Sequence, residues 1–319
     1  MTMSGRVLTV ALGFALFAGA ASANNLSITN VSVEGHSATT ALVKFDISWD
    51  NSWRFAAGGD SLYFHDAAWV FFKVKKDTSG EEWQHVKLEG TGVNPAGFDT
   101  GTGTAIEMAV PVDGAGMFVR RSSDGAGGVA AQQVTAVWNF AANGFTKNDK
   151  VKIQAMGIEM CYVAQGAFKV GDGLKDMGQL YEGGTGGNPQ PTPFAITSAG
   201  AIECGNEAGK LWGASTSGNN SMGGAGTIPA AYPNGYNAFY CMKYAVTQGQ
   251  YADFLNSLTR VQQTARCTAT TLNYYMSDVA GGSAAIQRRN TVQLVEDPGG
   301  SQPRRYATVT PDRACNWLS

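Results

Sequence analysis

The sequence predicts a mainly β protein with a smaller α+β part towards its C-terminal end. Three observations lead to this prediction: short stretches of alternating hydrophobic residues, abundant glycine, and one clear strand–helix unit late in the chain. Glycine occurs 41 times in 319 residues, well above the average of roughly 7%, which favours a turn-rich fold. A chain of this length is enough for about two domains.

Residues 24–157 show the pattern of an immunoglobulin-like β-sandwich. Within Ala41–Trp49, hydrophobic side chains at every second position predict a strand with one buried face. Ala67–Lys75 is hydrophobic on both faces and is predicted to be a central strand, while Asp50 and Asn51 indicate a turn. Short strands separated by turns at such intervals are typical of a sandwich. The other strands are expected at Leu26–Val33, Trp83–Leu88, Ala105–Val112, Met117–Arg121, Gln133–Phe140 and Val151–Met156.

The composition argues against a nucleic-acid-binding surface, and the N-terminal residues predict export from the cytoplasm. The formal net charge is -2 and 15% of the residues are charged, without the basic excess that nucleic acid requires. Residues 1–23 combine Arg6, the apolar stretch Val7–Ala20 and the small-residue site Ala21–Ala23, which is the pattern of a cleaved signal peptide. No other apolar run approaches the roughly 18 residues of a membrane span. We therefore expect a secreted or cell-surface protein that starts near Asn24.

The five cysteines are candidates for disulfide bonds because export is expected. All five lie in the second half of the chain, and no C-x-x-C spacing indicates a zinc ribbon or a thioredoxin-type pair. In an exported protein we expect one or two disulfides with one thiol left over, in a pairing that the sequence does not assign. The alternative is that all are reduced and packed as small apolar groups. The cysteines are Cys161, Cys204, Cys241, Cys267 and Cys315.

The stretch Phe239–Leu258 is a strand–helix unit around which the second half is organised. Phe239–Val246 is apolar and aromatic apart from Lys243, which predicts a strand. Thr247 and Gln250 have the spacing of a capping box, in which each side chain bonds the backbone amide of the other residue. The helix that follows is expected to bury one face, formed by Tyr251, Phe254, Leu255 and Leu258.

This unit resembles the opening strand and helix of the formylglycine-generating-enzyme, or sulfatase-modifying-factor, domain, whose fold is C-type-lectin-like. Ala245 departs from the acidic residue or proline of the family, and Met160–Gly171 is similar to the strand that begins such domains. The resemblance implies that residues 158–319 form the first half of a domain of this type, with a Gly-rich surface insertion over 171–236. The residues that carry the resemblance are Phe239, Met242, Lys243, Val246, Thr247, Gln250, Tyr251 and Phe254.

The resemblance implies a scaffold without the chemistry of its family. Those enzymes oxidise a sulfatase cysteine to formylglycine with copper bound by two cysteines near the end of the domain. The copper cysteines and the calcium ligands belong to the second half of the domain, which residues 158–319 do not match. No catalytic, cofactor-binding or metal residue is therefore assigned, and copper or calcium is expected only together with that half.

Two sets of polar residues are assigned no site. His36, His65 and His85 lack metal-ligand spacing and are predicted to be surface or turn residues. Thr259–Tyr306 is predicted to be a polar loop. Its two basic stretches, Arg288-Arg289-Asn290 and Pro303-Arg304-Arg305, are expected on a solvated face.

Aromatic residues in Gly- and Asn-rich loops are the candidates for a binding surface. Aromatic rings offer a large contact area with little loss of rotamer freedom, so a protein or carbohydrate ligand is predicted; the alternative is that the rings pack the loops onto the core. The expected function is a secreted binding or structural module. A piece of a formylglycine-generating-type oxidase and a self-associating subunit of a surface fibre or layer are the alternatives. The candidate ligand contacts are Trp212, Tyr232, Tyr236, Tyr274 and Tyr275.

Overall fold

The chain divides into two compact units. Unit 1 comprises Met1–Phe55, His65–Cys161 and Met242–Ser319, and unit 2 comprises Ala56–Phe64 and Tyr162–Cys241. The predicted signal peptide, residues 1–23, and much of the Gly-rich insertion lie outside the described residues. The computed structural model describes residues 25–57, 62–78, 80–171, 180–184, 192–212, 225–267, 271–276 and 289–316.

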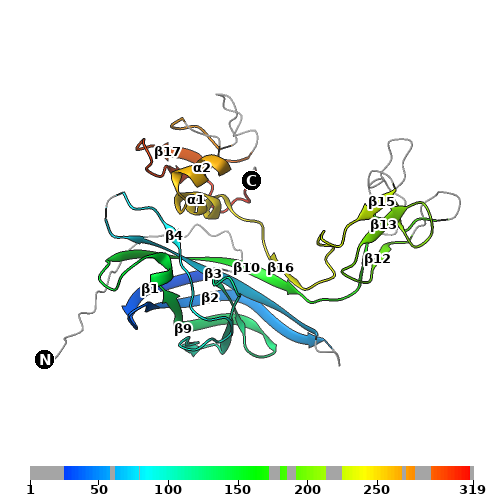
Figure 1. Cartoon of the computed structure of the whole chain (residues 1–319), viewed down its shortest axis with the longest axis horizontal. Helices are drawn as coiled ribbons and strands as arrows, with labels where there is room; N and C mark the ends of the chain where they lie inside the picture. The colour runs from blue at the N-terminus through cyan, green and yellow to red at the C-terminus, as the bar shows by residue number, and fades with distance from the viewer. Residues whose placement is uncertain are drawn as a thin grey trace. The chain divides into compact units, whose positions relative to one another are not determined.

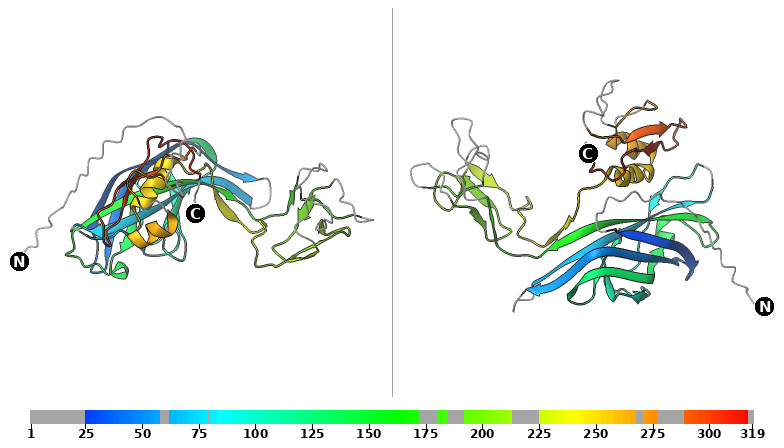
Figure 2. Two further views of the ribbon diagram at one scale, coloured as in Figure 1. Left: turned by 90° about the horizontal axis from the view of Figure 1, so that it is seen from above. Right: turned by 180° about the vertical axis from the view of Figure 1, so that it is seen from behind.

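Unit 1 is built on one curled sheet, so the predicted mainly β character is confirmed (Figures 1 and 2). The hydrogen-bonded order is β5-β7-β8-β3-β2-β9-β6; in addition β1 pairs with β2, β4 and β10 pair with β3, and β16 pairs with β10. The short helix η1 (Ala141–Asn143) follows β9. The strands are β1 (Ser27–Gly35), β2 (Thr40–Ala57), β3 (Leu62–Lys76), β4 (Gln84–His85), β5 (Gly92–Val93), β6 (Thr102–Gly103), β7 (Ile106–Val110), β8 (Met117–Arg121), β9 (Gly125–Asn139), β10 (Val151–Val163) and β16 (Phe239–Met242).

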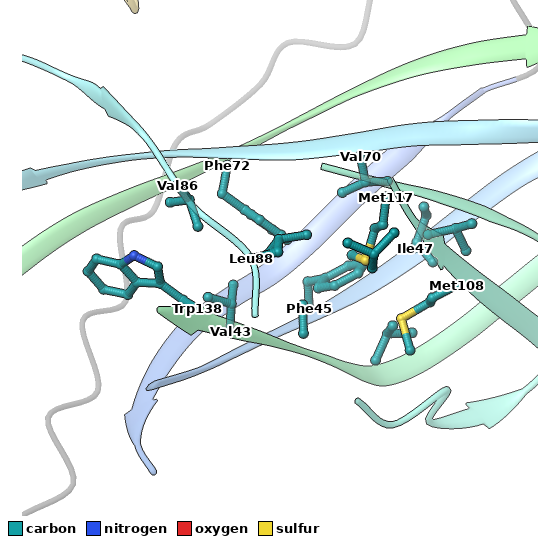
Figure 3. Packing of buried hydrophobic residues seen from close by; sticks show 14 of the residues in the cluster. Val43, Phe45, Ile47, Val70, Phe72, Val86, Leu88, Met108, Met117 and Trp138 are labelled. Atoms are coloured by element: carbon teal, nitrogen blue, oxygen red, sulfur yellow. The ribbon is translucent and has the colours of Figure 1, made fainter. Parts of the chain in front are cut away.

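The alternating hydrophobic residues of β2 form the centre of the core, as predicted. Val43, Phe45, Ile47 and Trp49 are all buried, and the Phe45 ring meets Phe72 of β3 edge-on with centroids 5.6 Å apart. Burying a side chain of this size contributes about 1.5–3 kcal/mol, so this cluster is a main source of stability. Figure 3 shows the neighbouring core side chains, among them Val70, Val86, Leu88, Met108, Met117 and Trp138.

Strand β2 does not end at Asp50 and Asn51, where the sequence predicts a turn. The strand continues to Ala57, and Asn51 has φ of 50°, in the left-handed region that asparagine tolerates better than most residues. The register of β2 against β9 shifts between Trp49 and Ser52. The turn prediction is therefore wrong, and a β-bulge takes its place.

The C-terminal part of unit 1 contains the predicted helix and one that was not predicted (Figure 1). The capping box of Thr247 and Gln250 is confirmed: both of its hydrogen bonds are present. The predicted polar loop over Thr259–Tyr306 is wrong, because Thr259 and Gln262 form a second capping box that begins another helix. The elements are α1 (Gln248–Asn256), α2 (Arg260–Arg266), β17 (Gln293–Glu296) and β18 (Arg305–Ala307), and β17 pairs with β18.

One buried amide side chain joins three segments of this C-terminal part. Gln263 of α2 is fully buried, and its Nε2 donates to the carbonyl oxygens of Leu255 at 2.9 Å and Arg304 at 2.8 Å. Its Oε1 accepts the backbone N–H of Arg304 at 2.8 Å. Gln263 thus fixes the end of α1 and the start of β18 to α2.

Arg304 is buried, which contradicts the solvated face predicted for it. Its Nε donates to Asp297 Oδ2 at 3.0 Å, and Arg260 donates to both oxygens of Asp297, at 2.6 and 2.9 Å. The bond from Arg260, supported by the Gly299 N–H and by Arg304, holds the pKa of Asp297 well below its usual range. This charge cluster joins Arg260 of α2 to Asp297 and Arg304, and the composition alone does not indicate it.

Unit 2 consists of short paired strands. β11 (Phe168–Val170) pairs with β12 (Phe194–Ile196). β13 (Ile202–Gly205) pairs on its two edges with β14 (Leu211–Trp212) and β15 (Gly226–Ile228). Across both units, none of the helices described is long and apolar enough to cross a membrane.

We expect Gln263→Ala to lower the free energy of unfolding by about 2–4 kcal/mol, because buried backbone groups of Leu255 and Arg304 lose their partner. Urea denaturation measures the change. Val261→Ala, at an exposed position of the same helix, is the control and should stay within about 0.5 kcal/mol of the wild type. Equal effects of the two substitutions would contradict the role given to Gln263.

Candidate functional site

Asp66 of β3 is a buried carboxylate that is surrounded by donors from β2. Its Oδ1 accepts Ser52 Oγ–H at 2.8 Å and Trp53 N–H at 2.9 Å, and its Oδ2 accepts Trp49 Nε1–H at 3.2 Å. In a regular strand, residues 49 and 52 would face opposite sides. The bulge at Asn51 inserts an extra residue, so both of them reach the same carboxylate.

Lys243, the residue that follows β16, places its ammonium group beside this carboxylate. Its backbone N–H donates to the Glu159 carbonyl oxygen at 2.9 Å, next to the β10–β16 pairing. Its Nζ lies 2.9 Å from Asp66 Oδ2 and 3.8 Å from Glu159 Oε2, and it donates to the Asn51 carbonyl oxygen at 3.2 Å. We call Lys243, Asp66 and Glu159 the Lys243 cluster.

The Lys243 cluster is almost completely removed from water. The side chains of Asp66, Glu159 and Lys243 are 1%, 4% and 13% exposed. Burying a charge costs several kcal/mol, and attraction between partners offsets this only when their hydrogen bonds are also satisfied. Four donors converge on Asp66, namely Trp49, Ser52, Trp53 and Lys243. The arrangement is therefore built around this carboxylate.

A second set of polar and charged side chains lies around His65, which directly precedes Asp66 in β3. His65 is buried, and Arg120 Nη1 lies 3.1 Å from its Nε2. Arg120 Nε and Arg54 Nη1 both donate to Glu107 Oε1, at 2.7 and 2.9 Å. Burial, followed by the charges of Arg120 and Arg54, lowers the pKa of His65 to about 4. His65 is therefore neutral at pH 7.

The histidine prediction is wrong for His65 and holds for His36, which is exposed. His65 lies inside β3, and its partner Arg120 is 55 positions away, so no local pattern indicates their contact. His85 is half-buried, and burial lowers its pKa. Among the described residues, no group of three or more His, Cys, Asp or Glu side chains is arranged to hold a metal ion.

The predicted ligand-contact aromatics lie in both units. In unit 2, Trp212 and Tyr236 are half-buried and Tyr232 is exposed. In unit 1, Tyr274 is half-buried against the hydrophobic cluster around α1, and Tyr275 forms a β-bridge with Gln293. Tyr274 thus packs a loop onto the core, and Tyr232 presents its ring to solvent.

The loop that carries Tyr232 is held in place by Asn234. Asn234 Nδ2 donates to the carbonyl oxygens of Ser198 and Gly200, at 2.9 and 3.2 Å, while its Oδ1 accepts Tyr236 N–H at 3.1 Å. The Tyr232 N–H donates to the Pro229 carbonyl oxygen at 2.9 Å. The ring, 61% exposed, is therefore displayed by a loop with a fixed backbone.

The expected disulfides are not present. None of the five cysteines is joined to another in the described part of the chain. Cys204 and Cys267 are buried and pack as small apolar groups, which agrees with the alternative weighed from the sequence. Burial raises the pKa of the Cys315 thiol to about 11, so this side chain is a thiol rather than a thiolate at neutral pH.

In comparisons with known proteins, no family model, curated protein or solved structure matches the chain. The resemblance of Phe239–Phe254 to formylglycine-generating-enzyme domains stays a prediction.

We expect Lys243→Met to lower the free energy of unfolding by about 3–5 kcal/mol, because Asp66 and Glu159 would remain buried without their cation. Chemical denaturation measures the loss. The control is Lys44→Met, which removes the partner of Glu34 from a far more exposed pair; it should cost at most about 1 kcal/mol. Similar decreases in the free energy of unfolding in both variants would show that burial does not determine how much the Lys243 cluster contributes to stability.

We expect His65 to make stability depend on pH. The unfolded chain takes up a proton at this residue below pH 6.5, whereas folded His65 stays neutral down to about 4. The unfolded state binds more protons between these values, so the free energy of unfolding falls as the pH falls through this window. The free energy of unfolding is measured at pH 6.5 and at pH 4. Its decrease between these two pH values should be smaller in His65→Gln than in the wild type. The decrease in His36→Gln should equal that of the wild type.

Proposed function

We propose that this chain is a secreted, non-catalytic binding module that holds a carbohydrate or protein ligand on its exposed aromatic loops. The observation that carries the proposal is Tyr232, an exposed ring on a loop whose backbone is fixed by Asn234. A ring held in this way loses little freedom on binding, so contact with a flat apolar face of a ligand translates into affinity.

The scaffold of the proposed module is an immunoglobulin-like β-sandwich followed by the first half of a formylglycine-generating-enzyme-type, C-type-lectin-like domain. The support for the second part is local. Thr247 and Gln250 form both bonds of the capping box, and the rings of Tyr251 and Phe254 lie 5.8 Å apart on the helix that follows. Lys243, one of the residues that carry the resemblance, belongs to the buried Lys243 cluster.

The two alternative functions are supported by fewer observations than ligand binding. A piece of a formylglycine-generating-type oxidase follows from the resemblance alone, and a subunit of a surface fibre or layer follows from the Gly-rich, weakly charged composition. Secretion rests on the pattern of residues 1–23. Of the three functions, only ligand binding is supported by a specific side chain among the described residues, the exposed ring of Tyr232.

The test is binding of the purified full chain to an array of immobilised oligosaccharides. We expect Tyr232→Ala to weaken binding by about tenfold or more, which corresponds to about 1.4 kcal/mol of lost contact. Tyr232→Phe keeps the ring and should bind within about threefold of the wild type, since the exposed hydroxyl adds little.

The control is Tyr244→Ala, which removes an exposed tyrosine of unit 1 and should leave binding unchanged. If the wild type binds no oligosaccharide, the carbohydrate form of the proposal is wrong. If Tyr232→Ala binds as well as the wild type, Tyr232 is not the contact. Circular dichroism of each variant excludes loss of folding as the cause of weaker binding.

A further inference from the structure

We propose that Lys243 and Asp66 become joined by an amide bond between Nζ and Cγ, formed by the folded chain itself with Glu159 as the proton-transfer group. The two residues are 177 positions apart in the sequence, yet Nζ lies 2.9 Å from Asp66 Oδ2. This proposal goes beyond the ligand-binding role and does not depend on it, because the two involve different residues.

Folding supplies the proximity that this condensation needs. An amine and a carboxyl group that are held in contact react as one molecule, and such positioning can be equivalent to a very high reactant concentration. Lys243 is held by its own backbone bond to Glu159 and by the Asn51 carbonyl oxygen. Asp66 is held by its donors from β2. Neither reacting group is free to turn away.

The reaction is balanced without any outside reagent. Lys243 transfers a proton to a carboxylate of the cluster and becomes a neutral amine, whose lone pair attacks Cγ of Asp66. A second proton leaves the nitrogen, Oδ2 departs with both protons as water, and the Nζ–Cγ bond replaces the Cγ–Oδ2 bond. The ammonium and carboxylate thus become one amide and one water, with no change of oxidation state.

The donors around Asp66 are divided in the way that this reaction requires. Ser52 Oγ–H and Trp53 N–H both point at Oδ1, the oxygen on which negative charge gathers when nitrogen adds to Cγ. Donors fixed in place before charge develops are a strong source of transition-state stabilisation. Lys243 and the Trp49 indole N–H lie on the other oxygen, Oδ2, which leaves as water.

Glu159 is placed to move protons between the nitrogen and the leaving oxygen. Its Oε2 lies 3.8 Å from Lys243 Nζ, a separation that a small side-chain movement closes, and catalytic hydrogen bonds are often long before the reaction begins. Glu159 accepts the proton that leaves nitrogen, delivers it to Oδ2, and returns to its starting state.

Burial favours the amide over the ion pair. The bond removes two charges from an environment in which charge is costly, and the low exposure of Asp66 and Glu159 limits the water that could reverse the reaction. The pairs Lys44–Glu34 and Lys152–Asp77 have equally short separations of 2.8 and 2.9 Å. Both are more exposed, at 28%/49% and 42%/41%, and they serve as internal controls.

The test is mass spectrometry of a tryptic digest of the purified full chain. Trypsin does not cleave at a lysine whose amine is in an amide. We therefore expect a branched peptide that joins residues 55–73 to residues 211–260, with a mass lower by one water than the sum of the two. Recovery of 55–73, 211–243 and 244–260 as separate linear peptides, in the amounts of other tryptic peptides, would overturn the proposal.

Two variants separate the bond from the ion pair. Lys243→Arg keeps the positive charge but forms no such amide, so all its peptides should be linear. Glu159→Gln keeps the size of the side chain but carries no proton between the reacting atoms, so the branched peptide should be largely lost. Branched peptide at the wild-type level in Glu159→Gln would overturn the role of Glu159. A branched peptide at Lys44–Glu34 or Lys152–Asp77 would contradict the argument from burial.

Discussion

A buried carboxylate must be surrounded by donors, and this constraint at Asp66 explains several features of unit 1. The bulge in β2 turns Ser52 and Trp53 towards the same oxygen. Lys243, which follows β16, is bonded through its backbone N–H to Glu159 of β10. Because β10 pairs with β3, the Lys243 side chain reaches Asp66 of β3 from this position. The hydrophobic cluster is a main source of stability. The Asp66 carboxylate in addition requires that Ser52, Trp53 and Lys243 lie within hydrogen-bonding distance of it.

Local patterns in the sequence predicted local structure well. Alternation in β2 identified the buried face that contains Phe45 and Ile47, because side-chain direction in a strand depends only on position along the chain. The capping box at Thr247 was predicted for the same reason, since its two bonds involve residues three positions apart. Thr259 and Gln262 carry the same signal at the start of α2, and the polar composition around them concealed it.

The candidate site could not be predicted in the same way, because its contacts are between residues far apart in sequence. Lys243 was recognised as the one charge in an apolar stretch, but its partner Asp66 lies 177 positions away. The pair Asp50-Asn51 is typical of a turn, but a left-handed asparagine suits a bulge equally, and the structure has the bulge. The burial of Arg304 is a different case: its partner Asp297 is only seven positions away, and the polar composition of the stretch does not indicate which of its charges meet.

The contact between positions 66 and 243 also determines how the chain would respond to mechanical load. A pull on the two ends of the polypeptide would pass from Asp66 to Lys243 across this contact and would bypass the segment between them. The loop that carries Tyr232 belongs to that segment. As long as the contact holds, a chain under tension would keep the exposed Tyr232 ring in the arrangement it has at rest.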